Sequence, residues 1–388
     1  MPRPMVLRHG THIFPTRQRV LLPNLLLNGR FLMRKATGVD RVATELAAAL
    51  LACELPGVLS ATHPAGVVVD QQDRPDVLMK ATEVSVSRLR GQLWEQTALL
   101  QTNPQDWLLS LCNMGPVLRR KQIVMMHDAQ VFREPQSYSR AFRRWYSIAQ
   151  PLLARNAALV LTVSEHSKRE LEAFGVVPPG KARVVHNGAD HILRVTADAA
   201  TLPRFKLMPQ GYILAIGSSA PHKNLAFLVK AAQARTDTSQ PLVIAGGGDA
   251  AVFAGQGISA SDNVKILGRV SDSELRALYE NATALAFPSL TEGFGLPPLE
   301  AMACGCPVIA STGGAIPEIC GTAAILLDPY DQMGWTAALS TITYDPAIRF
   351  SLSQAGIARA AQFTWAAAAE TLVGYLAELA QAEHPQPA

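Results

Sequence analysis

Hydrophobic and polar positions along the chain form two kinds of segment. Short apolar runs predict β-strands that are buried on both faces, and stretches with an apolar residue every three or four positions predict amphipathic helices. The clearest early pair is the run Leu22–Leu27 followed by the periodic stretch from Gly38 to Leu51. Further strands are predicted at 107–111, 123–126 and 158–163 in the first half, and at 212–216, 242–245, 264–267, 284–287 and 308–310 in the second.

Strands that alternate with helices predict parallel sheets with helices on both faces. The pattern weakens from Ala197 to Gln210, a stretch with two prolines, and we place a domain boundary there. The expected fold class is α/β, with two Rossmann-like domains facing each other across a cleft. The last periodic segment, about Trp365 to Ala380, has no strand after it and is free to cross back between the domains. The expected limits are a flexible N-terminus at 1–20, a first domain at 21–200, a second domain at 206–362 and a crossover helix at 363–382.

Length and composition agree with this organisation. With 388 residues, 48% of them hydrophobic and 17% charged, the chain is expected to form two domains with sizeable cores rather than to be disordered. The net charge of +4 is unevenly distributed, because residues 1–205 have 26 Lys and Arg against 16 Asp and Glu, a balance of +10. Residues 206–388 have 9 against 15, a balance of −6. Such an asymmetry suggests that one half meets an anionic surface or ligand.

Cysteine usage and the absence of long apolar segments indicate the compartment. The chain has five cysteines, an odd number without framework spacing, which favours a reducing, cytosolic environment. Cys304 and Cys306 form a C-x-C pair, but no second pair or nearby His completes a metal site, so buried thiols are expected. Residues Met1–Val20 lack the features of a signal peptide, and no segment reaches the length of a membrane span. The protein is therefore expected to be soluble, or at most peripheral to a membrane.

The most informative stretch connects a predicted strand ending at Phe287 to a helix that contains Glu300. Gly293 and Gly295 let the backbone approach a ligand, and the N-terminus of the helix favours a phosphate through its N–H groups and dipole. Glu292 and Glu300 would repel a phosphate, so we expect them to accept hydrogen bonds from hydroxyl groups, such as those of a sugar and a ribose. An ordinary loop without a bound ligand would explain Glu300, as a favourable acidic residue in the first helical turn. It would not explain Glu292 next to two glycines.

Three other loops follow predicted strands, where ligands bind in parallel sheets. Lys223, after a turn at Gly217, is a cation suited to a diphosphate, although a solvated lysine would explain it as well. His127 ends a strand of the first domain and is either a site residue or a semi-buried histidine. The loop at 36–41, which contains Gly38, either faces the cleft or is an ordinary strand–helix turn.

Motifs of several other site types are incomplete. The run Gly246-Gly247-Gly248 lacks the G-x-G-x-x-G pattern of a dinucleotide site and predicts a flexible turn. No D-x-D sequence supplies the usual carboxylate clamp for the metal of a sugar nucleotide, and neither G-x-S-x-G nor H-E-x-x-H is present. The sequence therefore predicts neither a metal nor a cofactor.

Taken together, the motifs resemble the retaining glycosyltransferases of family 4, a GT-B group that contains many mannosyltransferases of bacterial surface polysaccharides. The resemblance covers about residues 22–375 and is most specific in the second half. The matching segments are Thr37–Arg41, His127-Asp128, Val163–Leu171, Asn187–Asp190, Gly217–Asn224, Gly268–Asp272, the E-x7-E stretch Glu292–Glu300, its continuation to Val308, and Pro317-Glu318.

The resemblance implies a role for each matched position. Glu292 would hold the hydroxyls of the donor sugar, Glu300 the ribose, and Lys223 the diphosphate leaving group. His127 would touch the donor sugar from the opposite domain. The remaining donor-binding candidates are Gly217, Ser218, Asn224, Arg269, Val270, Gly293, Phe294, Gly295 and Leu296, and the candidates on the acceptor side of the cleft are Gly38, Asp40 and Arg41.

Two positions depart from the family pattern. Ser218-Ser219-Ala220 stands where many relatives have an arginine, so the leaving-group charge would rest on Lys223 and the helix N-terminus. Asp40 stands where many relatives have a small residue. Because a carboxylate there would repel a diphosphate, Asp40 is expected to face the acceptor or to pair with Arg41.

The activity implied by the resemblance is transfer of a hexose from a nucleotide-diphosphate sugar, with retention at the anomeric carbon and without a metal. GDP-mannose is the favoured donor, with UDP- and dTDP-hexoses as alternatives, and a lipid-linked or other oligosaccharide is the favoured acceptor. A GT-B epimerase or phosphorylase, or a non-catalytic sugar-nucleotide-binding partner, is the competing hypothesis. The presence of Lys223, Glu292 and Glu300 argues against a non-catalytic partner.

The basic surplus of the first half has two explanations, and neither requires nucleic acid. Basic residues beside aromatic ones suit an anionic membrane surface, and a solvated basic face would explain them equally well. The expected localisation is cytoplasmic, with or without peripheral contact to the membrane. The residues concerned are Arg119, Arg120, Lys121, Arg140, Arg143 and Arg144, with Trp145 and Tyr146.

Overall fold

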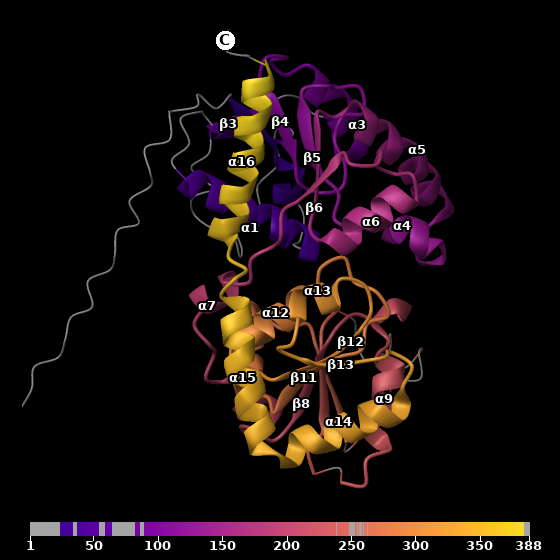
Figure 1. The fold of residues 1–388 in the computed structure, drawn as a ribbon, viewed down its shortest axis with the longest axis vertical. Coiled ribbons are helices and arrows are strands. Elements are labelled where there is room, and N and C mark those ends of the chain that lie inside the picture. Colours follow the sequence, from indigo (N-terminus) through magenta and orange to yellow (C-terminus); the bar gives the residue numbers. More distant parts are fainter. Residues whose placement is uncertain are drawn as a thin grey trace, which may run out of the picture.

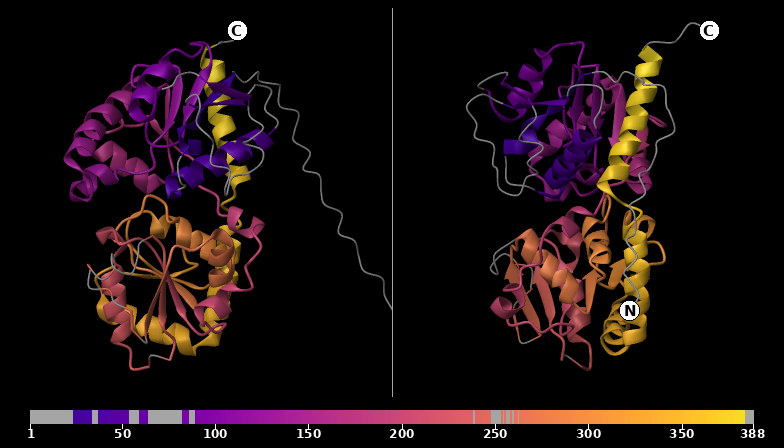
Figure 2. Two further views of the ribbon diagram at one scale, coloured as in Figure 1. Left: turned by 180° about the vertical axis from the view of Figure 1, so that it is seen from behind. Right: turned by 90° about the vertical axis from the view of Figure 1, so that its left-hand side faces the viewer.

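The structure is a computed structural model that describes residues 24–33, 37–53, 59–63, 82–85, 89–237, 239–247, 253, 255, 258, 260–261 and 263–383. These residues form two α/β domains, which are stacked along the long axis of the molecule (Figures 1 and 2). The upper domain contains the first half of the chain together with the last helix, and the lower domain contains the second half. The predicted flexible segment 1–20 lies outside the described residues.

In the described part of the chain, a parallel sheet of seven strands forms the centre of the upper domain, in the order β3-β2-β1-β4-β5-β6-β7. Every residue of β1, β4, β5 and β6 is buried, as expected for strands with helices on both faces. The strands are β1 (Leu25–Asn28), β2 (Leu59–His63), β3 (Thr82–Ser85), β4 (Trp107–Ser110), β5 (Gln122–Met125), β6 (Leu159–Thr162) and β7 (Ala182–Val184). The helices are α1 (Gly38–Ala52), α3 (Gly91–Thr97), α4 (Gln130–Arg133), α5 (Arg140–Asn156) and α6 (Glu165–Ala173). The short helices α7 (His191–Arg194) and α8 (Thr201–Phe205) follow β7 and pack against the lower domain.

The lower domain repeats this plan with a parallel sheet of six strands among its described residues, in the order β10-β9-β8-β11-β12-β13. The strands are β8 (Ile213–Ile216), β9 (Leu242–Ala245), β10 (Val264–Gly268), β11 (Ala284–Phe287), β12 (Val308–Ser311) and β13 (Ile325–Leu327). The helical segments are the 3-10 turn η4 (Pro221–Lys223) and the helices α9 (Leu225–Gln233), α11 (Asp272–Asn281), α12 (Leu296–Ala303), α13 (Ile316–Cys320), α14 (Gln332–Tyr344) and α15 (Pro346–Ala360). The two parallel sheets confirm the predicted α/β class.

Polar residues after the strands begin several of the helices. The Ser164 hydroxyl accepts a hydrogen bond from Ser167 N at 2.9 Å and caps α6. Ser271 and Glu274 form a reciprocal capping box at the start of α11. These caps hold the first helical turns at the carboxyl ends of the strands, which is the edge of each sheet that faces the other domain (Figure 1).

The last helix, α16 (Trp365–Glu383), leaves the lower domain and packs against α1 in the upper one (Figure 1). Leu372 and Leu376 are buried in the same core as Leu46 and Leu50 of α1. The chain therefore passes between the domains twice. The two passages touch at Gly188, where a Cβ would lie 2.3 Å from the backbone nitrogen of Trp365, so only glycine fits.

Four strands were not predicted from the sequence, namely β2, β3, β7 and β13. β2 and β3 form one edge of the upper sheet and mix polar with apolar residues, and β13 is a three-residue strand at the edge of the lower sheet. The first strand covers Leu25–Asn28 rather than Leu22–Leu27, of which 22–23 lie outside the described residues. Within the described chain, no helix combines the length and apolar character that a membrane crossing requires.

Candidate active site

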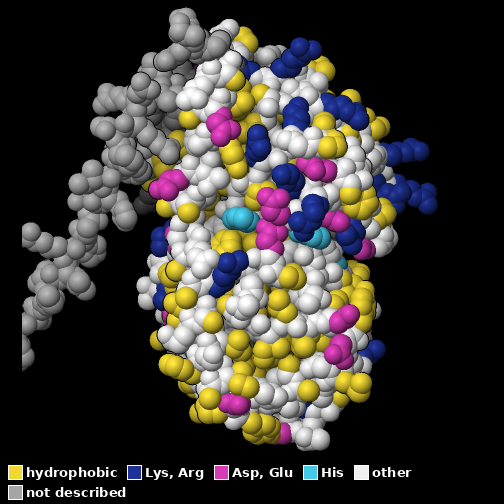
Figure 3. Space-filling view, in the orientation of Figure 1, with side chains coloured by type: hydrophobic (Ala, Val, Ile, Leu, Met, Phe, Trp, Pro, Cys, Tyr) yellow, Lys and Arg dark blue, Asp and Glu magenta, His cyan; other side chains and the backbone are white. Residues whose placement is uncertain are grey.

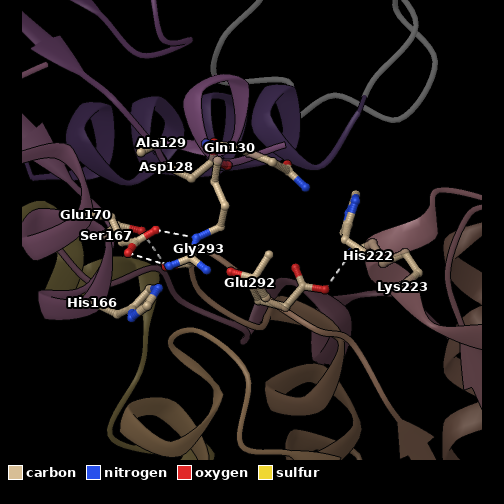
Figure 4. Close-up of a pocket in the computed structure, with 12 residues that line it drawn as sticks. Asp128, Ala129, Gln130, His166, Ser167, Glu170, His222, Lys223, Glu292 and Gly293 are labelled. Atoms are coloured by element: carbon tan, nitrogen blue, oxygen red, sulfur yellow. Dashed lines mark hydrogen bonds and ion pairs between the residues drawn. The ribbon is translucent and has the colours of Figure 1, made fainter. Parts of the chain in front are cut away.

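A pocket of about 430 Å³, including its solvent-filled mouth, lies where the carboxyl ends of the two sheets meet (Figure 4). Its walls come from both domains, so neither domain forms it alone. The upper domain contributes Asp128, Ala129, Gln130, Arg133, His166, Ser167 and Glu170, and the lower domain contributes His222, Lys223, Thr291, Glu292 and Gly293.

Lys223 and Glu292 form an ion pair in the lower wall of this pocket. Lys223 ends η4, after β8, and Glu292 lies in the loop after β11, so adjacent strands bring the two together. The Lys223 Nζ atom lies 2.6 Å from Glu292 Oε1 and 5.6 Å from the centre of the Phe287 ring (Figure 4). Both side chains are partly exposed, so the amine and the carboxylate can exchange partners with a ligand.

Gly293 of the lower domain lies directly against the upper domain in the pocket. A Cβ on this residue would lie 3.0 Å from both Asp128 Cβ and the His127 carbonyl oxygen, which explains the need for a residue without a side chain. The hydroxyls of Ser164 and Ser167 donate to the Gly293 carbonyl at 2.6 and 2.9 Å. The first turn of α6 therefore holds the loop that contains Glu292.

The N-terminus of α12 offers fewer donors than the sequence suggests. Pro297 and Pro298 are the second and third residues of the helix, and proline has no N–H group. Among the described residues, the N–H groups of Phe294, Gly295 and Leu296 have no hydrogen-bond acceptor in the protein. The Phe294 side chain is buried, and the centre of its ring lies 6.2 Å from the centre of the Phe363 ring. Phe294 can therefore offer a ligand only its backbone.

Glu300 lies outside the pocket wall and is almost fully buried. His191 Nε2 contacts its Oε1 at 3.0 Å, and the Tyr279 hydroxyl donates to its Oε2 at 3.1 Å. Trp365 Nε1 donates to His191 Nδ1 at 3.1 Å. Because an indole N–H can only donate, Nδ1 carries no proton, and the proton of the neutral His191 ring lies on Nε2, facing the carboxylate.

Two opposing effects determine the ionisation of Glu300. Burial raises the pKa of the carboxyl, but the hydrogen bond from His191, the charge of Arg41 and the hydrogen bond from Tyr279 outweigh burial and lower the pKa. Burial and the neighbouring Glu300 raise the pKa of Tyr279, so the phenol stays protonated and donates. Glu300 is thus an ionised acceptor in a dry environment.

The residues at the start of α1 have separate roles. Asp40 is buried and accepts hydrogen bonds from the Thr37 N–H at 3.0 Å and the Thr37 hydroxyl at 2.7 Å, so it forms part of the capping box of α1. Arg41 pairs with Asp272 of the lower domain at 2.7 Å. Gly38 is exposed, and a Cβ there would meet nothing within 4 Å. Of these three candidates, Arg41 is the one that bridges the domains.

His127 is buried behind the pocket rather than in its wall. Its Nε2 lies 2.8 Å from the Leu111 carbonyl oxygen, and its backbone N–H donates to the Asn113 side chain at 2.7 Å. Burial lowers the pKa of the ring, so it is neutral near pH 7. The next residue, Asp128, lines the pocket instead.

The other donor-binding candidates also lie outside the pocket wall. The Asn224 amide donates to the carbonyls of Pro288 and Pro329 at 3.3 and 2.9 Å, and it thereby ties together the loops after β11 and β13. Gly217 and Ser218 follow β8 and are partly buried. Arg269 is exposed after β10, and Val270 packs against the core at the same edge.

Several pocket residues were not identified from the sequence. Arg133 and Glu170 form a two-pronged ion pair with distances of 2.6 Å, and the hydrogen bond from Arg133 lowers the pKa of Glu170 (Figure 4). Burial and the charge of Lys223 lower the pKa of His222, whose buried Nδ1 has no partner among the described residues. The segment 163–171 matched the family motifs without a role, and it was the signal from which His166, Ser167 and Glu170 could have been selected.

A second contact between the domains lies at the N-terminus of α6. The Glu318 carboxylate accepts from the Glu165 and His166 N–H groups at 2.9 and 3.0 Å and contacts His186 Nε2 at 2.9 Å. Burial raises the pKa of Glu318, but these hydrogen bonds outweigh it and lower the pKa. A carboxylate of the lower domain thus caps a helix of the upper one.

No group of three or more His, Cys, Asp or Glu residues in the described chain is arranged to hold a metal ion. All five cysteines are free thiols. Cys306 is buried, and burial raises the pKa of the neighbouring Cys304 to about 12, so both are protonated.

Two family descriptions match the chain. Residues 102–192 match Glycosyltransferase Family 4, and residues 210–345 match Glycosyl transferases group 1. These matches cover parts of the upper and lower domains, respectively.

Individual relatives extend this similarity over most of the chain. O-antigen chain mannosyltransferase B of Escherichia coli is 29% identical over 85% of this chain and 93% of its own length. The MMP alpha-(1->4)-mannosyltransferase of Mycolicibacterium hassiacum is 32% identical over 72% of this chain and 67% of its own length. Among solved structures, Anabaena Alr3699/HepE in complex with UDP and glucose has a TM-score of 0.70 at 17% identity, covering 92% of this chain and 100% of that one. The chain therefore belongs to glycosyltransferase family 4, within the group 1 glycosyltransferases, and has their two-domain GT-B fold.

Proposed function

We propose that this glycosyltransferase transfers a hexose from a nucleotide-diphosphate sugar to a lipid-linked or other oligosaccharide, with retention at the anomeric carbon. The favoured donor is GDP-mannose, and the favoured context is the synthesis of a surface polysaccharide. The observation that carries the proposal is the Lys223–Glu292 pair, 2.6 Å apart, in a pocket with walls from both domains.

Lys223 would bind the diphosphate of the donor. Negative charge grows on this group as the bond to the sugar breaks, and a cation positioned beforehand stabilises that charge. Glu292 holds the Lys223 amine near the pocket when no ligand is present. The unpaired N–H groups of Phe294, Gly295 and Leu296 would supply further donors.

The two glutamates would bind hydroxyl groups. Glu292 would accept hydrogen bonds from the sugar, and Glu300 from the ribose. Each oxygen of Glu300 already has one protein partner, and each retains a lone pair for a second donor. His127 would act by holding the turn that leads to Asp128, and the Asp128 carboxylate would meet the donor or acceptor sugar from the upper domain.

The chemical step would not require a nucleophilic carboxylate. The acceptor hydroxyl would attack the anomeric carbon from the face that the phosphate leaves, and the departing phosphate would take the hydroxyl proton. The contacts of Gly293 with the upper domain would exclude water and thereby limit hydrolysis of the donor.

The relatives support the choice of mannose. Two mannosyltransferases, one described as acting on an O-antigen chain, are about 30% identical to this chain. The HepE structure contains UDP and glucose, which keeps a UDP-hexose as the alternative donor. Five free cysteines fit a reducing, cytosolic location for the reaction.

The test is sugar transfer with purified enzyme, a lipid-linked oligosaccharide, and GDP-mannose, UDP-glucose or a dTDP-hexose. We expect turnover with GDP-mannose, an α-linkage by NMR, and a loss of about 10²-fold or more in kcat for Lys223→Ala. Glu292→Ala should also lower turnover, whereas Lys230→Ala, an exposed lysine on α9, should not. Unchanged turnover in both site variants would overturn the assignment, and sugar isomerisation without an acceptor would identify an epimerase instead.

A further inference from the structure

Helix α5 exposes large apolar side chains to solvent along one side. Trp145, Ile148 and Leu152 are 38%, 62% and 43% exposed. Their spacing of three and four residues keeps them within about 60° of each other around the helix axis. The opposite side, with Tyr146 and Leu153, is buried in the core of the upper domain. The exposed row is therefore not required for folding.

A row of arginines runs beside these apolar residues. Arg140, Arg144 and Arg155 are all exposed on α5. The helix, Arg140–Asn156, contains four arginines and no acidic residue. A helix with an apolar row next to a cationic row is typical of segments that lie in the interface of an anionic bilayer.

The apolar surface continues onto two neighbouring segments. The Asn156 amide, one turn beyond Leu152, donates to the Val117 carbonyl at 2.9 Å and so places Leu118, which is 74% exposed, beside the row. Gln96 of α3 bonds to the backbone of the same loop, accepting from Val117 N at 2.9 Å and donating to the Gly115 carbonyl at 2.8 Å. On α3, Leu93 is 67% exposed one turn before Gln96.

Two of the residues first associated with a membrane do not belong to this surface. Arg119 is buried, and its guanidinium donates to four carbonyls and the Thr102 hydroxyl. Tyr146 is 9% exposed and stacks on Phe142. The sequence pattern located the correct helix, but only the structure shows which side of it faces outward.

We propose that Leu93, Leu118, Trp145, Ile148 and Leu152, with the flanking Arg140, Arg144 and Arg155, form a surface that docks on an anionic lipid bilayer. The apolar side chains would enter the boundary between headgroups and acyl chains, with the arginines on the lipid phosphates. Figure 3 shows Lys and Arg side chains projecting from the right-hand flank of the upper domain, the side where Figure 1 draws α3 and α5.

Charge favours a bilayer over a second copy of the chain. A symmetric contact through α5 would bring the arginine rows of two copies together without acidic partners, because residues 107–158 contain eight basic residues and only Asp128 and Glu134 as acids. Asp128 lies in the pocket rather than on this surface. An anionic lipid surface satisfies both rows at once.

The docking surface also has a defined relation to the pocket. Gln130 and Arg133 of α4 line the pocket, and α5 begins seven residues after Arg133. An acceptor held in the bilayer by a lipid tail would reach the pocket past α4, which packs against α5. Docking itself does not depend on sugar transfer and can be measured without a nucleotide sugar.

The experiment is flotation of the full chain with phosphatidylcholine vesicles, with and without phosphatidylglycerol, at low and high salt. We expect binding only to the anionic vesicles, weakened by salt. Trp145→Ser/Ile148→Ser/Leu152→Ser and Arg140→Gln/Arg144→Gln/Arg155→Gln should each reduce binding about tenfold or more. The single variant Ile148→Glu should reduce it in the same direction, which guards against a triple variant that folds poorly.

Matched controls lie on other surfaces. Met333→Ser/Tyr344→Ser/Phe350→Ser removes apolar side chains of the lower domain that are 84%, 61% and 69% exposed. Arg183→Gln/Lys206→Gln/Lys230→Gln removes exposed cations elsewhere. Both controls should bind like the wild type. Equal losses in test and control variants, equal binding to neutral vesicles, or no binding at all would overturn the proposal. The proposal would also be overturned if light scattering showed the wild type to be a dimer and the α5 variants to be monomers. That result would identify the surface as a protein interface.

Discussion

Glu300 stays ionised in a buried position because His191 and Arg41 oppose the effect of burial on its pKa. His191→Ala removes the hydrogen bond and leaves burial in place, so we expect the pKa of Glu300 to rise. As the pH falls, the carboxyl then takes up a proton earlier than in the wild type. The KM for the donor should increase about tenfold, first on the acid side of the pH profile, with a smaller change in kcat.

His191→Gln is the matched control for this prediction. Glutamine can donate to Glu300 and accept from the Trp365 indole, as the neutral histidine ring does. The pH profile of KM should therefore stay close to that of the wild type. Identical acid shifts in the Ala and Gln variants would show that the hydrogen bond is not what keeps Glu300 ionised.

Individual site residues could be predicted from the sequence where their position after a strand was informative. Lys223 and Glu292 were identified in this way, and adjacent strands of one sheet bring them together. His222 and Asp128 could not be selected, because the pocket forms between residues almost a hundred positions apart in different domains. Glu300 was expected beside the ligand, and its burial against His191 and Tyr279 depends on packing that no local pattern encodes.

At the scale of elements, α6 depends on the lower domain for part of its N-terminal cap. The lowered pKa of Glu318 means that its contribution to stability is present above the ordinary pKa of about 4.5 and is lost as the pH falls through the lowered value. Glu318→Gln should lower the free energy of unfolding near pH 7 by about 1 kcal/mol. Below pH 4.5, the free energy of unfolding of this variant should fall less steeply than that of the wild type, as measured by thermal unfolding.

Glu280→Gln provides a comparison within one domain. Glu280 pairs with Arg276 on α11 over one helical turn and is partly exposed, so its removal should cost less than about 0.5 kcal/mol. If Glu318→Gln and Glu280→Gln showed the same stability and the same pH dependence, the capping role of Glu318 would be contradicted.

The element pattern could be predicted wherever strands are central and continuously apolar. β8, β9 and β11 matched the expected positions closely because each is almost entirely buried and has a neighbouring strand on both sides in the sheet. β3 and β13 were missed because edge positions tolerate polar or very short strands. The helix after β11 was correctly placed, but the two prolines in its first turn remove N–H groups that a phosphate would need.

At the scale of the whole molecule, α16 makes the end of the chain a structural part of the upper domain. Leu372→Ala should lower the free energy of unfolding by about 2–5 kcal/mol, because the side chain is fully buried in the core shared with α1. Hydrogen exchange should show the loss of protection in α1 as well as in α16. Glu370→Ala, on the exposed side of α16, should change stability by less than about 0.5 kcal/mol.

The uneven distribution of charge also belongs to this scale. The pocket uses few cations, and its basic residues Lys223 and Arg133 are both paired with glutamates. The +10 balance of the first half therefore is not explained by binding a nucleotide. Four of the basic residues of this half lie on α5, where all four are exposed.

The two passages of the chain between the domains are fastened to each other. Ala189 N donates to the Phe363 carbonyl at 3.1 Å, and the Asp190 carboxylate accepts from Trp365 N at 2.8 Å. Paired in this way, they join the two domains at one edge of the molecule, beside α7 (Figure 1). A rotation of the domains about this edge would displace the His191–Glu300 contact, which is next to it in the chain, less than the contact of Gly293 with Ser164 in the pocket. Groups bound at Glu300 would therefore stay in place while the sugar end of the pocket opens and exchanges its contents.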